Sequence, residues 1–335
     1  MKKIIIIALC AIMMCSTACT TNNKQNAEEK TTFEAEITQT PIQSLEPTQK
    51  PTPTPTPIKT PEPTPSPTPS PTPEPTSTAI QTQEPKDSTE PRKFDHDGET
   101  KEVIYDDGDI KVEMITHHEK YLTYFVADIH VSDVKYLKTA FSHGEYGGRG
   151  EKTDVQARNN NAIVAISGDY YDFRDKGLVI RNGKVYRTKL SELDVCVLYS
   201  DGTMKTYSPK ECEERLDEIL ANDPWQSWCF GPKLLDNGEP MTEFNSKVNK
   251  RNPRCVIGYY APGHYCLVTV DGRQGSYSRG LEIPDLAQLM HDLGCKEAFN
   301  LDGGQTSMMA VNGETYNQPF EGGRSVSDII YVGKN

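Results

Sequence analysis

Three acidic residues each follow an apolar run typical of a β-strand and have a glycine beside them. They are Asp169 in AIVAISGDYYDF, Asp271 in YCLVTVDGRQGS and Asp302 in AFNLDGGQTS. A rigid strand that ends in a polar residue usually presents that residue to a loop-lined cleft. The glycines allow a ligand to approach the backbone and let successive N–H groups turn toward an anion. The shared pattern predicts a binding or catalytic site built on carboxylates.

Arginines accompany these acids. Arg254, Arg273 and Arg324 each lie next to a predicted strand. A planar guanidinium binds phosphate or carboxylate through two parallel hydrogen bonds, which lysine cannot do. Together the acids, arginines and glycine loops indicate an anionic, hydroxyl-rich substrate such as a sugar phosphate. The alternative is that each Asp–Arg set is a structural ion pair that fixes a loop, and the residues alone leave both interpretations open.

The elements that would position these residues are mainly strands. Alternating residues at 110–116 and 120–131 predict one hairpin, and the apolar run 161–167 predicts a buried strand. Two further hairpins are predicted at 194–207, with an Asp-Gly turn, and at 255–270, with Pro-Gly at the tip.

Two segments have helical spacing, 211–222 and 283–294. The second segment leads directly into the strand that ends at Asp302. Four of its apolar residues fall on one face of the predicted helix: Leu286, Leu289, Met290 and Leu293. We therefore expect an α+β fold, with a single strand-rich domain, a mixed sheet and a few helices.

The first 100 residues predict no domain. Residues 1–19 have two lysines, a short apolar stretch and small residues before a cysteine, as in an export signal. The end of this segment resembles a bacterial lipoprotein cleavage site, so we expect Cys19 to carry lipid and to attach the protein to the outer face of the cell membrane. Plain secretion is the alternative.

Residues 20–100 form a linker rich in proline and threonine. Sixteen of the 24 prolines lie between Pro41 and Pro91. Alternating proline and threonine cannot build a hydrogen-bonded ladder or a core, so we expect a solvated polyproline II spacer, with an ordinary disordered tail as the alternative. The folded domain is expected to occupy residues 101–335.

Charge and residue spacing exclude several classes of function. The formal net charge of −12 argues against a general nucleic-acid binder. There is no nucleotide-binding loop and no serine nucleophile elbow. The cysteines and histidines show no metal-ligand spacing, so no metal site is assigned, and the six cysteines beyond residue 100 are interpreted as small core residues.

Four segments, in order, resemble the bacterial phosphodiester glycosidase family, which is related to N-acetylglucosamine-1-phosphodiester α-N-acetylglucosaminidases. They are SGDYYDF, NPRCVIGYY, VDGRQGS and FNLDGGQTSMM, and a closing RSVSDIIYV also fits. The resemblance covers about residues 150–333. It departs from the usual pattern at Ser167, Cys255, Gln305 and Thr306.

The resemblance implies hydrolysis of the bond between a sugar's anomeric carbon and a phosphodiester oxygen. It implies that Asp302 acts at the anomeric carbon, with Asp271 or Asp169 as the second carboxylate. Binding of phosphate and sugar is then expected of the surrounding residues: Arg254, Arg273, Arg324, Asn300, Gly303, Gly304, Thr306 and Ser307.

Two other functions stay open at this stage. One is a phosphodiesterase that cuts the phosphorus–oxygen bond with a divalent ion held by Asp169, Asp271 and Asp302. The other is a non-catalytic binder of cell-wall polysaccharide. We expect no organic cofactor, and the expected partners are a sugar phosphate or a cell-surface glycan and, through Cys19, the membrane.

Overall fold

The computed structural model describes residues 98–334. The expected signal segment, Cys19 and most of the linker lie outside these residues. The first strand, β1 (Gly98–Asp106), begins just before the expected start of the domain. No helix in the described range is long and apolar enough to cross a membrane.

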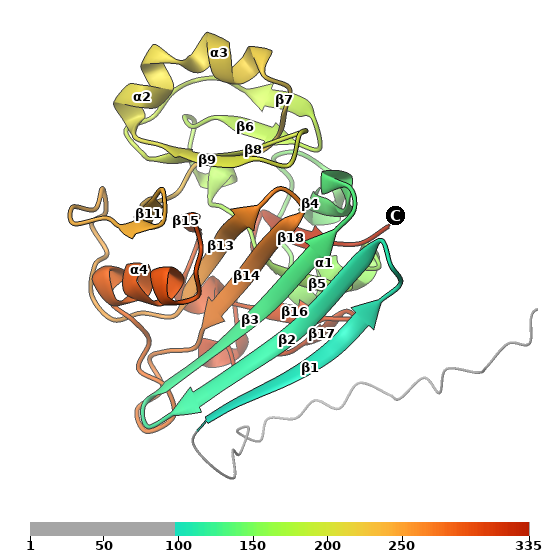
Figure 1. Cartoon of the computed structure of the whole chain (residues 1–335), viewed down its shortest axis with the longest axis vertical. Helices are drawn as coiled ribbons and strands as arrows, with labels where there is room; N and C mark the ends of the chain where they lie inside the picture. Colours follow the sequence, from blue (N-terminus) through green and yellow to red (C-terminus); the bar gives the residue numbers. More distant parts are fainter. Residues whose placement is uncertain (1–97, 335) are drawn as a thin grey trace, which may run out of the picture. The chain divides into compact units, whose positions relative to one another are not determined.

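The fold is α+β, as expected, and three antiparallel sheets dominate it (Figure 1). The largest has the order β1-β2-β3-β14-β13-β15. Its other strands are β2 (Ile110–Glu119), β3 (Leu122–Val131), β13 (Arg254–Ala261), β14 (His264–Val270) and β15 (Glu297–Asn300).

The second sheet has the order β7-β6-β10-β8-β9. Its strands are β6 (Val179–Arg181), β7 (Lys184–Arg187), β8 (Val195–Tyr199), β9 (Met204–Tyr207) and β10 (Pro224–Trp228). The third has the order β17-β16-β5-β18-β4. Its strands are β4 (Leu137–Phe141), β5 (Val164–Ser167), β16 (Met309–Val311), β17 (Glu314–Thr315) and β18 (Asp328–Val332).

A short pair, β11 (Leu235–Asp236) and β12 (Glu239–Pro240), completes the strands of the described residues. Every pairing between the named strands is antiparallel, and a single parallel bridge joins Tyr121 to Ser278. The expected mixed sheet is therefore antiparallel in all of its named strand pairs.

One central core lies between the three sheets, because all of them contribute to it. It includes Ile129 and Ile257 from the first sheet, Trp228 from the second and Ile330 from the third. Helices cover the outer faces, and each makes a smaller cluster with its own sheet: α1 (Thr153–Asn159), α2 (Pro209–Glu214), α3 (Leu216–Ala221) and α4 (Ile283–Asp292).

Helix α4 packs on the first sheet and confirms the predicted apolar face, since Leu286 and Met290 are fully buried. Helices α2 and α3 lie over β8 and β9 (Figure 1). They replace the single helix expected at 211–222, because Arg215 leaves the helical conformation, with φ −118° and ψ 13°. Ser208 caps α2 in a reciprocal capping box with Glu211.

All six cysteines in the described range are buried and unpaired, as the interpretation of small core residues predicts: Cys196, Cys212, Cys229, Cys255, Cys266 and Cys295.

Candidate active site

Three of the sequence motifs meet at one end of the first sheet. In the register of the antiparallel strands, Arg254 at the start of β13 lies opposite Val270 at the end of β14, and Val256 lies opposite Asn300 at the end of β15. The backbone of the next residue, Leu301, still donates to Cys255 O at 2.8 Å. Strand order therefore brings the NPR, VDGR and NLDGG segments together, although up to 48 residues separate them in sequence.

A pocket of about 410 Å³ opens at this end of the sheet. Six of the predicted site residues line it: Arg254, Arg273, Asn300, Asp302, Gly303 and Gly304. The structure thus brings together two of the three predicted arginines and the acid that was expected to act at the sugar, while Arg324 lies outside the pocket lining.

Asp302 is buried, and burial raises the pKa of its carboxyl to about 6. Thr306 and Arg324 oppose this shift only in part. Gly303 N donates to Asp302 Oδ1 at 3.0 Å, and Arg324 Nη2 lies 3.8 Å from Oδ2. A carboxyl that titrates near neutral pH can change its protonation state during a reaction, which is the usual requirement for acid–base work.

Arg254 and Arg273 supply positive charge to the pocket. Burial, and next the neighbouring Arg273, lowers the pKa of Arg254 to about 10. Within residues 98–334, neither guanidinium makes an ion pair with a carboxylate. Arg254 donates to backbone carbonyls, and Arg273 donates to Asn252 Oδ1 at 2.7 and 3.0 Å. Two adjacent cations without an acid partner form a local site for an anion.

Asn300 lines the pocket and has one buried polar atom without a partner in residues 98–334. Its Nδ2 donates to Gly231 O at 2.8 Å, which fixes the amide so that Oδ1 is the other polar atom. Oδ1 is buried and has no hydrogen-bond partner among the described residues. Because an unpaired buried acceptor is costly, a hydroxyl donor from a ligand in the pocket would stabilise it.

Gly303 and Gly304 line the pocket, but both of their backbone amides are hydrogen-bonded within the protein. Gly303 N donates to Asp302 and Gly304 N donates to Pro253 O at 2.9 Å, so neither amide is directed to an anion. A Cβ at Gly303 would lie 2.9 Å from Pro253 O, and Gly304 has φ +71°. The two glycines are needed because the loop packs closely against the start of β13.

Thr306 and Ser307 are fully buried and do not line the pocket. Thr306 Oγ1 donates to Gly303 O at 2.8 Å and holds the loop. The donors expected from these two side chains are thus not presented to a ligand in this structure.

Asp271 is buried behind the pocket and does not line it. Its carboxylate accepts from Asn317 Nδ2 at 2.7 Å, from Tyr277 OH at 2.9 Å and from Gln318 N at 3.0 Å. The carboxylate therefore ties two loops together, the one that carries Tyr277 and the one that carries Asn317 and Gln318.

Asp169 also lies outside the pocket lining, in a buried cluster with Arg181 and Asp328. Arg181 Nη2 lies 3.0 Å from Asp169 Oδ1 and 2.8 Å from Asp328 Oδ2, and all three side chains are almost fully inaccessible. Asp169 Oδ2 accepts from Cys229 N at 2.8 Å. This cluster positions the segment that leads to Phe230 and Gly231, two residues of the pocket wall.

Arg174 was not predicted as a site residue, but it lines the pocket and acts with Arg324 against the raised pKa of Asp302. Its guanidinium lies over the rings of Tyr170 and Phe230, at 5.3 and 5.0 Å from their centroids, and donates to Cys229 O at 3.1 Å. Arg174 directly follows the GDYYDF segment. Its position after that motif was the only available signal.

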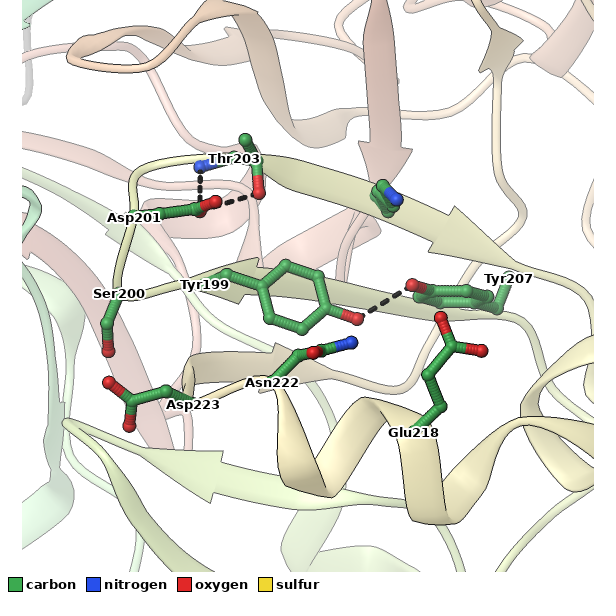
Figure 2. A pocket seen from close by; sticks show the side chains of 9 residues that line it. Tyr199, Ser200, Asp201, Thr203, Tyr207, Glu218, Asn222 and Asp223 are labelled. Carbon is green, nitrogen blue, oxygen red and sulfur yellow. Dashed lines mark hydrogen bonds between the residues drawn. The ribbon is translucent and has the colours of Figure 1, made fainter.

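A second pocket, of about 430 Å³, lies between the β8–β9 hairpin and α3. Figure 2 shows its two tyrosine hydroxyls directed at each other, and Tyr199 and Tyr207 are 2.7 Å apart there. Asp201 caps its own turn through Thr203, and Glu218 forms a two-pronged pair with Arg215. None of the predicted site residues lines this pocket, so the first pocket is the better candidate.

The three acids that the metal-dependent phosphodiesterase alternative would need do not form a metal site among residues 98–334. Among the described residues, one group of histidine, cysteine and acid side chains is close enough to hold an ion: Asp128, His130 and His264. None of the three predicted catalytic acids belongs to it.

Comparison with known proteins agrees with the geometry of the first pocket. A profile of the phosphodiester glycosidase family matches residues 160–333, slightly more than half of the chain. The chain belongs to the phosphodiester glycosidase family. The match includes the pocket residues from Arg174 to Gly304 and the sheet end that carries them.

Two relatives extend this result. The SPbeta prophage-derived uncharacterized protein YomE of Bacillus subtilis (strain 168) is 31% identical over 186 residues, which is 52% of this chain and 28% of that protein. The chain therefore spans little more than a quarter of this relative's length. The catalytic domain of zebrafish N-acetylglucosamine-1-phosphodiester α-N-acetylglucosaminidase, auto-inhibited by its pro-peptide, superposes with a TM-score of 0.56. That match covers 71% of this chain and 88% of the zebrafish domain at 18% identity, and it shows a shared fold.

Proposed function

We propose that this member of the phosphodiester glycosidase family is a hydrolase that cleaves the bond between a sugar's anomeric carbon and a phosphodiester oxygen. The main supporting observation is one pocket in which a buried carboxyl with a pKa of about 6 lies with two arginines that form no ion pair with a carboxylate of residues 98–334. The name of the family and that of the zebrafish relative support the same reaction class.

The chemistry divides between the two kinds of side chain. The leaving group is a phosphate monoester, which is already a stable anion, so the pocket must mainly stabilise its charge. Arg254 and Arg273 would bind that phosphate. Asp302, when ionised, would stabilise or attack the oxocarbenium-like carbon, and a hydroxyl of the sugar would donate to Asn300 Oδ1.

Neither Asp271 nor Asp169, the two candidates for a second catalytic carboxylate, lines the pocket. Asp271 and Asp169 are both held by donors outside the pocket. We propose that they position the walls of the site, and that Asp302 is the only acid among them that contacts substrate.

For the substrate, we propose a sugar-1-phosphodiester of the N-acetylglucosamine type in a cell-surface polysaccharide or glycan. For the location, we propose export by residues 1–19 and attachment to the membrane through lipid on Cys19. The sequence pattern of the first 100 residues supports this location.

The product that carries an oxygen isotope from water shows which bond is cleaved. The full chain is incubated with an N-acetylglucosamine-1-phosphodiester in ¹⁸O-water, and mass spectrometry locates the label. Label in the free sugar supports glycosidic cleavage. Label in phosphate, with sugar-1-phosphate as a product, means phosphorus–oxygen cleavage and overturns the proposal. Binding without turnover across a panel of sugar phosphates would favour a non-catalytic wall binder instead.

A further inference from the structure

Three side chains that could bind a metal gather on the first sheet, away from the pocket. Strands β3 and β14 are neighbours (Figure 1), and His130 lies directly opposite His264 in their antiparallel register. Asp128 is two residues before His130, so it lies on the same face of the sheet. No sequence spacing indicates this group, because 134 residues separate the two histidines.

The atoms that would bind an ion converge. His264 Nε2 lies 2.7 Å from Asp128 Oδ1, and His130 Nε2 lies 3.6 Å from Asp128 Oδ2. The two imidazole rings are stacked, with centroids 3.9 Å apart. One ligand atom from each of the three side chains lies within 4.8 Å of the others. To bind one Zn²⁺ at about 2.0–2.2 Å, the two stacked rings would have to turn so that a nitrogen of each points at the same ion.

The group is both supported and accessible. Tyr260 stacks on His264, with centroids 4.2 Å apart, which holds that ring on the sheet. The side chains of Asp128, His130 and His264 are 26%, 50% and 31% exposed, so an ion can reach them from solvent. Two charged residues of β2 lie opposite the group on the same face: Glu113, opposite Asp128, and Lys111, opposite His130.

We propose that Asp128, His130 and His264 bind a late first-row divalent ion such as Zn²⁺. Two imidazoles and one carboxylate form a nitrogen- and oxygen-donor set that suits zinc, and Glu113 or water would complete the coordination. Paired strands form a rigid scaffold, so the backbone positions of the three ligands are fixed relative to one another.

This metal site is separate from the active-site pocket. His264 is the first residue of β14, whereas Arg254 pairs with Val270 at its other end. Six residues of strand at about 3.3 Å each place the two sites about 20 Å apart. The inference does not rest on the proposed hydrolase activity, and its test needs no substrate.

The test measures zinc bound to the metal-free full chain by equilibrium dialysis, with Co²⁺ absorption in the visible region as a report on the ligands. The wild type should retain one Zn²⁺ per chain at this site. His264→Ala and, separately, the more exposed His130→Gln should each weaken binding by at least about tenfold and reduce the Co²⁺ bands. Circular dichroism checks that the variants are folded.

His143→Ala is a matched control. His143 is 52% exposed and lies 3.9 Å from the carboxylate of Glu151, but within residues 98–334 it belongs to no group of three possible metal ligands. This variant should bind zinc as the wild type does. The proposal is overturned if the wild type binds no zinc, or if both His264→Ala and His130→Gln bind zinc as the wild type does. The three side chains would then be an ordinary hydrogen-bonded group on the sheet.

Discussion

Arg324 Nη2 lies 3.8 Å from Asp302 Oδ2, and it does so from a loop 22 residues further along the chain. Arg324 is half exposed while Asp302 is buried, so a screened surface cation faces a carboxyl whose pKa burial has raised to about 6. The cation lowers that pKa only in part. The pKa of Asp302 therefore depends on the charge of residue 324, and the carboxyl titrates at about pH 6.

We predict an acidic limb in the pH profile of hydrolysis. If Asp302 works as a carboxylate, kcat/KM should fall about tenfold per pH unit below pH about 6, where the carboxyl becomes protonated. Arg324→Ala should move this limb to higher pH, because the pKa of Asp302 rises when the cation is removed. Arg324→Lys keeps the charge and serves as the control. If the wild type and Arg324→Ala show the same acidic limb, then the limb does not arise from the ionisation of Asp302.

Asp302→Asn should reduce turnover by about 10²-fold or more, because the charge that stabilises or attacks the anomeric carbon is lost. The reason is that the amide cannot ionise, while the hydrogen bond from Gly303 can still form. Single-turnover kinetics, with circular dichroism to check the fold, measure the effect. Unchanged turnover would remove Asp302 from the mechanism.

The same substitution should make the protein more stable at neutral and alkaline pH. The pKa of Asp302 is higher in the folded protein than its ordinary value of 3.8, so ionisation destabilises the fold as pH rises from about 4 to about 6. Above pH 6, Asp302→Asn should raise the free energy of unfolding by at most about 3 kcal/mol. Below pH 4 the gain should vanish. Urea unfolding at pH 8 and pH 4 measures both values, and an equal gain at the two pH values would contradict this origin.

Arg273→Gln should weaken the binding of inorganic phosphate, measured as a competitive inhibitor, by about 10- to 100-fold, because one charge-assisted hydrogen bond is lost. Arg273 is chosen over Arg254 because Arg254 also holds three backbone carbonyls, those of Leu281, Val248 and Lys250. Arg279→Gln is the control, since Arg279 lies in the same loop but outside the pocket lining. Equal inhibition of all three proteins would exclude Arg273 from the phosphate site.

Arg181→Met should lower the free energy of unfolding by about 3–5 kcal/mol, because it leaves two buried carboxylates without their cation. Combining it with Asp169→Asn and Asp328→Asn removes the stranded charges and should recover part of the loss. Urea unfolding of the single and triple variants at pH 7.5 measures this. A triple variant less stable than Arg181→Met would contradict the charge-based account.

Hydrophobic periodicity predicted most of the elements around the site. The hairpins at 110–131, 194–207 and 255–270, and α4 with its buried face, are all present. The break between α2 and α3 was not predicted. Cys212 and Ile219 are seven residues apart and would share a face in one continuous helix as well, so the spacing carried no sign of the break at Arg215.

The sequence by itself indicated that Arg254, Asn300 and Asp302 serve one site, through their motifs and the family resemblance, but the pairing of β13 with β14 and β15 that brings them side by side was decided by the tertiary structure. The residue pattern without the resemblance could not distinguish Asp302 from Asp271 and Asp169, since all three follow a strand and adjoin a glycine. Tertiary structure decided this: residues 317–318 hold Asp271, Arg181 holds Asp169, and only Asp302 is left to line the pocket. The pairing of His130 with His264 was decided in the same way. The physical reason is that a strand fixes the position of a side chain's backbone, whereas packing against distant segments fixes what its polar atoms bind.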